Sequence, residues 1–211
     1  MAGCQTPDVQ ENQPVSAVQI ELRDARLLAI DQFAVSGGLG IWTDEDNLSA
    51  RVNWRQSADD QLSVALEGPL GIGSMVLESE PGRAGLTRGN VLIAEGDSPD
   101  TVLQRGLGLA APVPVEELGF WIRGLPGGAS GVVRDKQGRL TSLRYADKKG
   151  TSWQTRFLRY TQWSGEAVPA LITASGGPYS IRLVLKNWQS AATTAVPVRP
   201  ESNNRLPIPG R

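Results

Sequence analysis

Two stretches of the sequence alternate apolar and polar residues with a period of two, and this restricts the fold more than any other feature. Residues 48–55 and 62–67 carry leucine, valine, alanine or tryptophan at every second position, with mostly polar residues between them. Successive side chains of a strand point to opposite faces, so the pattern predicts half-buried antiparallel strands. Shorter strand-like segments follow at 73–79, 84–88, 91–95, 132–136, 140–146, 152–159, 170–174 and 180–187.

Many short strands with few helices predict a mainly β protein of the α+β class. We expect one large, strongly curved antiparallel sheet or an incomplete barrel with helices packed against it; two packed sheets are the alternative. Helices are expected at 15–33, 99–107 and 114–123. In the first, apolar residues recur every three or four positions and predict the buried face. They are Val18, Leu22, Ala25 and Leu28 or Ala29.

The 211 residues, of which 40% are hydrophobic, suffice for one well-buried domain. Residues 1–14 are polar and contain two prolines, as expected for a flexible tether. Residues 15–189 are expected to form the single domain. Residues 190–211 are rich in proline and poor in large apolar residues, which predicts a disordered tail.

Composition excludes several classes of function. The net charge of −1 provides no field to attract nucleic acid. Histidine is absent, which removes the commonest general base and the usual zinc ligand. A serine esterase is disfavoured because a Gly-x-Ser-x-Gly elbow is also missing. We expect no enzyme activity, no metal and no cofactor; the acidic run 44–46 is attributed to a solvated turn.

The single cysteine, Cys4, follows Ala2 and Gly3, as at the end of a bacterial lipobox. In that interpretation Cys4 carries the lipid anchor, and the chain is soluble when produced without its leader. The alternative is an ordinary cysteine near a frayed terminus. No apolar stretch reaches the roughly 18 residues that a membrane span requires.

An ordered set of short motifs carries a family resemblance. It comprises Trp54-Arg55-Gln56, Gly68-Pro69-Leu70-Gly71, Leu107-Gly108, Pro112-Val113-Pro114, Trp121-Ile122-Arg123-Gly124-Leu125-Pro126, Trp153, Tyr160, Val168-Pro169 and the segment from Ile181 to Trp188. With these motifs the chain resembles the LolB family of outer-membrane lipoprotein receptors over residues 15–188. The family pattern has Gly-Arg in its first strand, where this chain has Gly37-Gly38.

The resemblance implies an incomplete barrel of about eleven strands, with helices covering its open side and an apolar cavity for the acyl chains of other lipoproteins. The residues expected to line that cavity are Val52, Trp54, Val64, Leu66, Met75, Leu77, Leu118 and Trp121. Periodicity alone is equally compatible with a solid core.

The connection Gly68-Pro69-Leu70-Gly71 joins two predicted strands and has the composition of a turn. A leucine in such a turn is expected to point outward; the alternative is that Leu70 folds back and caps the barrel end. The resemblance implies that this loop enters the membrane and assists insertion of the cargo.

The function implied by the resemblance is that of a receptor on the periplasmic face of the outer membrane. It would accept acylated lipoproteins from the periplasmic carrier LolA, act as a monomer and insert its cargo into outer-membrane lipid. A periplasmic lipid carrier or sensor of the same fold is the alternative.

Overall fold

The computed structural model describes residues 14–44, 47–57, 60–68 and 73–190. These ranges contain eleven strands and three helices: α1 precedes six strands, and α2 and α3 separate these from the last five. In chain order they are α1 (Ala17–Leu28), β1 (Phe33–Trp42), β2 (Asn47–Gln56), β3 (Leu62–Glu67), β4 (Met75–Glu80), β5 (Arg83–Arg88), β6 (Val91–Gly96), α2 (Pro99–Leu107), α3 (Val115–Arg123), β7 (Ser130–Arg134), β8 (Leu140–Ala146), β9 (Ser152–Trp163), β10 (Glu166–Gly176) and β11 (Tyr179–Ser190).

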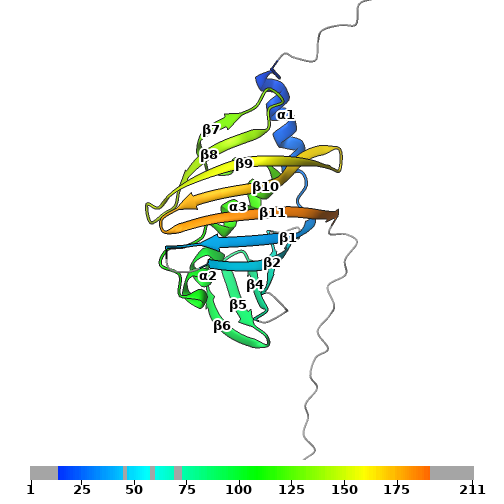
Figure 1. The fold of residues 1–211 in the computed structure, drawn as a ribbon. Helices are drawn as coiled ribbons and strands as arrows, with labels where there is room; N and C mark the ends of the chain where they lie inside the picture. Colours follow the sequence, from blue (N-terminus) through cyan, green and yellow to red (C-terminus); the bar gives the residue numbers. More distant parts are fainter. Residues whose placement is uncertain (1–13, 45–46, 58–59, 69–72, 191–211) are drawn as a thin grey trace, which may run out of the picture.

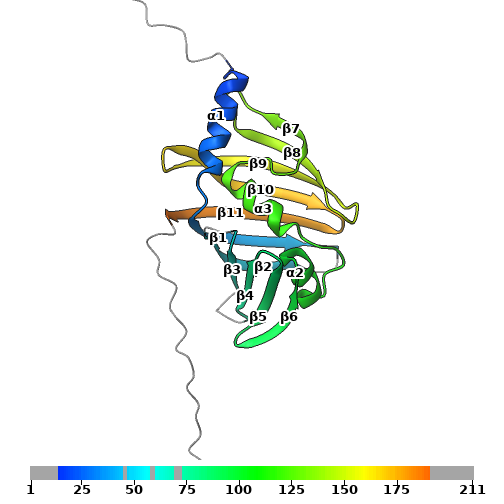
Figure 2. The ribbon, with the colours of Figure 1, turned by 180° about the vertical axis from the view of Figure 1, so that it is seen from behind.

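All eleven strands form one antiparallel sheet in the order β6-β5-β4-β3-β2-β1-β11-β10-β9-β8-β7. The terminal strands β6 and β7 do not pair with each other, so the sheet curves without closing (Figure 1). Seen from behind, α2 and α3 lie against one face of this sheet (Figure 2). The predicted curved, incomplete barrel with helices on its open side is therefore confirmed.

The pairing of β1 with β11 joins the two meanders of the sheet. Its register shifts between Val35 and Gly37. A Cβ atom on residue 37 would lie 1.8 Å from the Val184 carbonyl oxygen, so the close approach of the two strands requires glycine here. Position 38 has open space, because a Cβ there would meet nothing within 4 Å.

Helix α1 packs through a different face from the predicted one. Val18, Leu22 and Leu28 are 63%, 55% and 55% exposed, so the prediction that these residues face the core is wrong. The buried residues of the helix are Arg23 and Leu27. The helix also spans only Ala17–Leu28 and not the expected 15–33, and Phe33 is the first residue of β1.

Hydrogen bonds explain why an arginine occupies the buried face of α1. The Arg23 guanidinium donates to the carbonyl oxygens of Gly124 (3.5 Å) and Ala167 (3.2 Å). Leu27 packs with Leu125 and Val168 in a small apolar cluster. Because its charge meets these carbonyl oxygens and the Asp24 carboxylate (3.1 Å), Arg23 can be buried beside Leu27.

Helices α2 and α3 are linked through a shared cap. Ser98 caps α2 by accepting from the Thr101 N–H (3.4 Å), with Pro99 in the first turn. Pro114, before α3, has no capping side chain. Asp100 of α2 supplies that cap instead: its Oδ1 accepts from the N–H groups of Val115 (2.8 Å) and Glu116 (3.3 Å).

Candidate functional site

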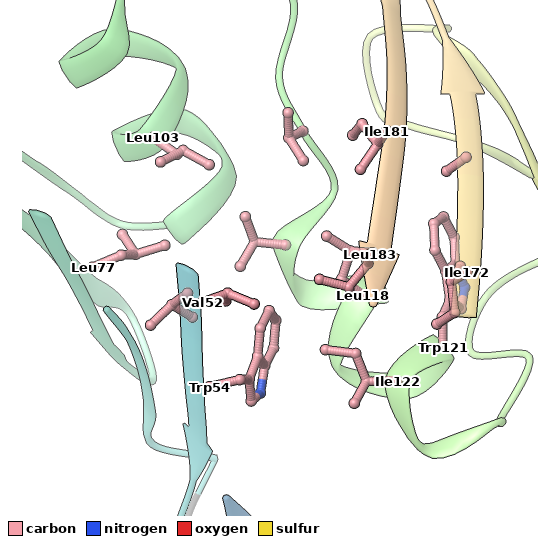
Figure 3. Close-up of a cluster of buried hydrophobic side chains, with 14 of the residues drawn as sticks. Val52, Trp54, Leu77, Leu103, Leu118, Trp121, Ile122, Ile172, Ile181 and Leu183 are labelled. Carbon is pink, nitrogen blue, oxygen red and sulfur yellow. The ribbon is translucent and has the colours of Figure 1, made fainter. Parts of the chain in front are cut away.

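A cavity of about 730 Å³ lies between the sheet and the segment that carries α2 and α3. In Figure 3 side chains from β2 and β4 face those of α2, α3 and β11 across this space. The volume lies within the range of ordinary small-molecule sites. The lining residues are Leu39, Ile41, Asn47, Leu48, Ser49, Ala50, Val52, Trp54, Val64, Leu66, Gly68, Gly73, Met75, Leu77, Arg88, Leu103, Leu107, Leu109, Val113, Val115, Leu118, Ile181 and Leu183.

Strand parity directs one face of β2 to β5 toward the cavity. Seven of the eight residues that the sequence suggested lie in its wall: Val52, Trp54, Val64, Leu66, Met75, Leu77 and Leu118. Trp54 pairs with Val64, which pairs with Leu77, so these side chains form one row across three strands. This arrangement follows from the period-two pattern of each strand.

Trp121 is the exception, because it does not line the cavity. Its side chain is fully buried and makes an edge contact with Tyr145, with ring centroids 5.9 Å apart. In Figure 3 it lies on the side of Ile172 of β10. Trp121 follows Leu118 by three helical positions, about 60° around the helix axis, and its ring contacts Tyr145 instead of the cavity.

Several lining residues were not identified from the sequence. Leu39 and Ile41 come from β1, so the first strand contributes to the wall despite Gly37 and Gly38. The helix α2 contributes Leu103 and Leu107, whose spacing of four places them on one face. Ile181 and Leu183 alternate on β11, a signal that was present in the sequence.

The cavity opens at the end of the sheet that holds the β1–β2, β3–β4 and β5–β6 connections. Alternate connections of an antiparallel meander lie at the same end. Lining residues at this end include Leu48, which is 41% exposed, and Gly68 and Gly73, which flank the β3–β4 connection. Pro69, Leu70 and Gly71 lie outside the described residues, as does Cys4.

Polar contacts hold the segment with α2 and α3, the helical cover of the cavity, to the sheet, and Asp100 links the two helices to each other. The Ala111 N–H donates to Tyr179 Oη (3.0 Å), and Lys149 Nζ donates to Gln104 Oε1 (2.8 Å). Burial raises the pKa of the Asp100 carboxyl to about 6, against the opposing effect of its two backbone hydrogen bonds. The nearby Glu116 and Glu117 charges raise it further.

The side chains that line the cavity are of the kind that suits contact with hydrocarbon. Its wall is mostly leucine, isoleucine, valine, methionine and tryptophan. Within the described ranges no cluster of three or more acidic or cysteine side chains is placed to hold a metal ion. None of the helices in those ranges has the length and hydropathy to span a bilayer.

Known proteins share both the sequence pattern and the fold. The family model for the outer membrane lipoprotein LolB matches residues 31–188. The outer-membrane lipoprotein LolB of Pseudomonas savastanoi pv. phaseolicola is 33% identical over 166 residues, 78% of this chain and 77% of that protein. Its counterpart from Pseudomonas putida is 34% identical over 167 residues, 78% of each chain.

Among solved structures, a LolA superfamily protein from Nitrosomonas europaea has a TM-score of 0.53 at 13% identity. The match covers 83% of this chain and 94% of that chain, and at this identity it shows the fold alone. The family match extends from before β1 to the end region of β11, so it includes the whole cavity wall. The chain therefore belongs to the LolB family.

Proposed function

We propose that this protein is an outer-membrane lipoprotein receptor that accepts acylated lipoproteins in its cavity and inserts them into the outer membrane. The observation that carries the proposal is the 730 Å³ apolar cavity between sheet and helices in a chain of the LolB family. The relatives from Pseudomonas are named outer-membrane lipoproteins, which supports the same location for this chain.

The cavity answers a physical problem of lipoprotein transport. A triacylated lipoprotein carries roughly 40 methylenes, and exposing them to water costs on the order of 30 kcal/mol at about 0.8 kcal/mol each. Such a molecule does not cross an aqueous space unaided. A receptor with an apolar cavity offers its acyl chains a continuous apolar environment during transfer.

The proposed donor of the cargo is the periplasmic carrier LolA. Transfer runs downhill if the acyl chains bind this cavity more tightly than the carrier's, so no nucleotide is required. The transfer is physical, with no bond made or broken, which agrees with a chain that has no histidine and a cavity of apolar side chains. We propose that the receptor acts as a monomer.

Two sequence positions complete the proposal. Cys4 would carry the lipid that anchors the protein at the periplasmic face of the membrane. Leu70 would enter the bilayer and bring the cavity mouth to it, because Gly68 and Gly73, on either side of this connection, line the cavity. Burial of one leucine is worth about 1.5–3 kcal/mol, enough to orient a protein that is already anchored.

The test is a two-step transfer assay with purified proteins. LolA loaded with a lipoprotein is mixed with this protein, and the complex is then given liposomes; each step is scored separately. The Ala50→Trp variant fills part of the cavity, whereas Arg51→Trp places the same side chain at the next, exposed position of β2. We expect Ala50→Trp to accept less cargo and Arg51→Trp to behave as wild type.

Folding of both variants is checked by circular dichroism. If wild-type protein takes no lipoprotein from LolA but binds free lipid, the receptor proposal is wrong and the lipid-carrier alternative holds. If the filled cavity accepts cargo as well as wild type, the cargo binds elsewhere.

A further inference from the structure

A positively charged side chain, Arg88, lies at the mouth of an otherwise largely apolar cavity. Arg88 is the last residue of β5 and follows the buried residues Ala84 and Leu86 at alternate positions, so its side chain leaves the inner face of the sheet. It lines the cavity and pairs across the strands with Met75. The Arg88 Nη2 atom lies 3.9 Å from Met75 Sδ.

Arg88 is the only charged residue in the cavity wall that the described residues form. None of the ion pairs within those same ranges involves it. Its recorded acceptor is a thioether sulfur, which is a weak one. A guanidinium has five donors in a fixed fork that suits paired oxygen acceptors, so one thioether sulfur uses little of its hydrogen-bonding capacity.

We propose that Arg88 is a subsite for the polar end of the acyl ligand, donating hydrogen bonds to oxygen atoms at the head of its chains. The proposal rests on the proposed function and adds orientation to it: methyl ends lie toward Trp54 and the helices, and head-group oxygens lie at the mouth. The ester carbonyls of a lipoprotein's diacylglyceryl group meet this description. So does the phosphate of a membrane phospholipid.

The orientation follows from the layout of the cavity. Across β2 to β5, Arg88, Met75, Leu66 and Val52 form the row nearer the mouth, whereas Leu77, Val64 and Trp54 belong to the next row inward. A chain inserted with its methyl end first would bury only hydrocarbon in the inner row. Its carbonyl oxygens would remain level with the guanidinium, where they keep a hydrogen-bond donor.

The experiment compares two lipopeptides that differ only at these oxygens. One is a dipalmitoyl-glyceryl-cysteine peptide with ester carbonyls, and the other is its dihexadecyl ether analogue. Each displaces a hydrophobic dye from the full-length protein in the same detergent. The variants are Arg88→Gln and, as a matched control, Arg83→Gln, an arginine that is exposed like Arg88 but lies at the opposite end of the same strand, outside the cavity wall.

We expect wild-type protein and Arg83→Gln to bind the ester about tenfold more tightly than the ether, as a hydrogen bond to a charged group allows. Arg88→Gln should lose this preference and keep the affinity for the ether. Dipalmitoyl phosphatidic acid is a third probe. If Arg88→Gln weakened the binding of this probe alone, the oxygen atoms that Arg88 binds would be those of a membrane phospholipid and not those of a lipoprotein.

Two results would overturn the subsite while leaving the proposed function intact: equal wild-type affinity for all probes, or an ester preference that survives in Arg88→Gln. Failure of every probe to displace the dye is a different result, since it would overturn acyl binding in the cavity and the subsite with it.

Discussion

Asp100 joins the two helices that cover the cavity, although its burial disfavours the charged form of its carboxyl group. Its carboxylate caps α3 from α2, yet burial raises its pKa from 3.8 to about 6. A raised folded-state pKa means that the folded protein binds this proton more tightly than the unfolded chain. The stabilisation is therefore fully present below about pH 4 and is lost as the pH rises through about 6.

We predict that Asp100→Asn flattens the pH dependence of stability between pH 4 and 6. The amide oxygen can still accept from Val115 and Glu116 without a buried charge, so at pH 7.5 the variant should be more stable by about 1–3 kcal/mol. Urea unfolding of both proteins across this range gives the answer, with exposed Asp97→Asn as the control. A pH profile that is unchanged in Asp100→Asn would contradict the assignment.

A second prediction at this scale separates acceptance of cargo from its delivery. If Leu70 enters the bilayer, Leu70→Glu should accept lipoprotein from LolA normally and fail at insertion, because a carboxylate loses hydration in the interface and anionic head groups repel it. Leu70→Ala should have a weaker defect, since it removes only about 1.5–3 kcal/mol of apolar burial. The readout is arrival of cargo in liposomes.

The control for Leu70 is Leu158→Glu, which changes an exposed leucine on β9 that is 53% accessible and does not line the cavity. It should deliver cargo as wild type does. Loss of acceptance in Leu70→Glu, as severe as the loss of insertion, would make Leu70 a docking or structural residue.

Among the elements, α1 shows where hydropathy misleads. Periodicity favoured a face with Val18 and Leu22, whereas the helix buries Arg23 and Leu27. The pattern could not include the carbonyl oxygens of Gly124 and Ala167, which lie more than 100 residues away and satisfy the arginine. A charged side chain is expected to be exposed only if the fold brings no hydrogen-bond acceptor to it from elsewhere in the chain.

This reversal of faces predicts the outcome of two leucine truncations. Leu27→Ala should destabilise the protein by about 2–5 kcal/mol, because it leaves a void beside Leu125 and Val168. Leu22→Ala should change the unfolding free energy by less than about 0.5 kcal/mol, since more than half of this leucine is exposed. Thermal and urea unfolding would contradict this packing if Leu22→Ala proved the more damaging change.

The seam between β1 and β11 offers a second matched pair. Gly37→Ala would drive a methyl group into the Val184 carbonyl oxygen, and we expect it to destabilise the protein by at least ~2 kcal/mol. Gly38→Ala adds the same methyl group where nothing lies within 4 Å, so its effect should be small. Equal unfolding free energies for the two variants would show that the strands do not approach as closely as described.

The glycines of β1 also explain why the cavity-lining residues of some strands were predicted from the sequence and those of β1 were not. Strands β2 and β3 alternate without interruption, and their inner residues were predicted. In β1, Gly37 interrupts a row of large apolar residues at alternate positions, and this break hides the alternation that brings Leu39 and Ile41 to the cavity. Where the backbone of a strand must approach its neighbour closely, glycine replaces larger residues, and the period-two pattern that would predict the strand is weakened.

For the molecule as a whole, the sequence predicted one wall of the site better than the other. Strand parity identified the sheet side, from Val52 to Leu77, because alternation fixes which face a side chain occupies. The helical side depends on how α2 and α3 dock across the sheet. Leu103, Leu107 and Val113 therefore became visible only in the structure, and Trp121 was misplaced for the same reason.

The space between the sheet and the helices is also a property of the whole molecule, and it is either a site for lipid or a gap in the core. The described contacts leave 730 Å³ lined by apolar groups, and the family match covers every strand around it. Because this volume opens at one end of the sheet, where lining residues such as Leu48 are exposed, it is a pocket and not a void inside a packed core. We therefore expect the hollow to be occupied by acyl chains during the working cycle.

The most direct measurement is photo-crosslinking with a triacylated lipopeptide that carries a diazirine within one acyl chain. After irradiation, digestion and mass spectrometry locate the adducts. We expect adducts on lining residues such as Leu66, Met75 and Leu107, and their loss when unlabelled lipopeptide competes. Adducts concentrated on exposed residues outside the cavity, such as Leu22 or Leu158, would contradict the claim that the cavity holds the acyl chains.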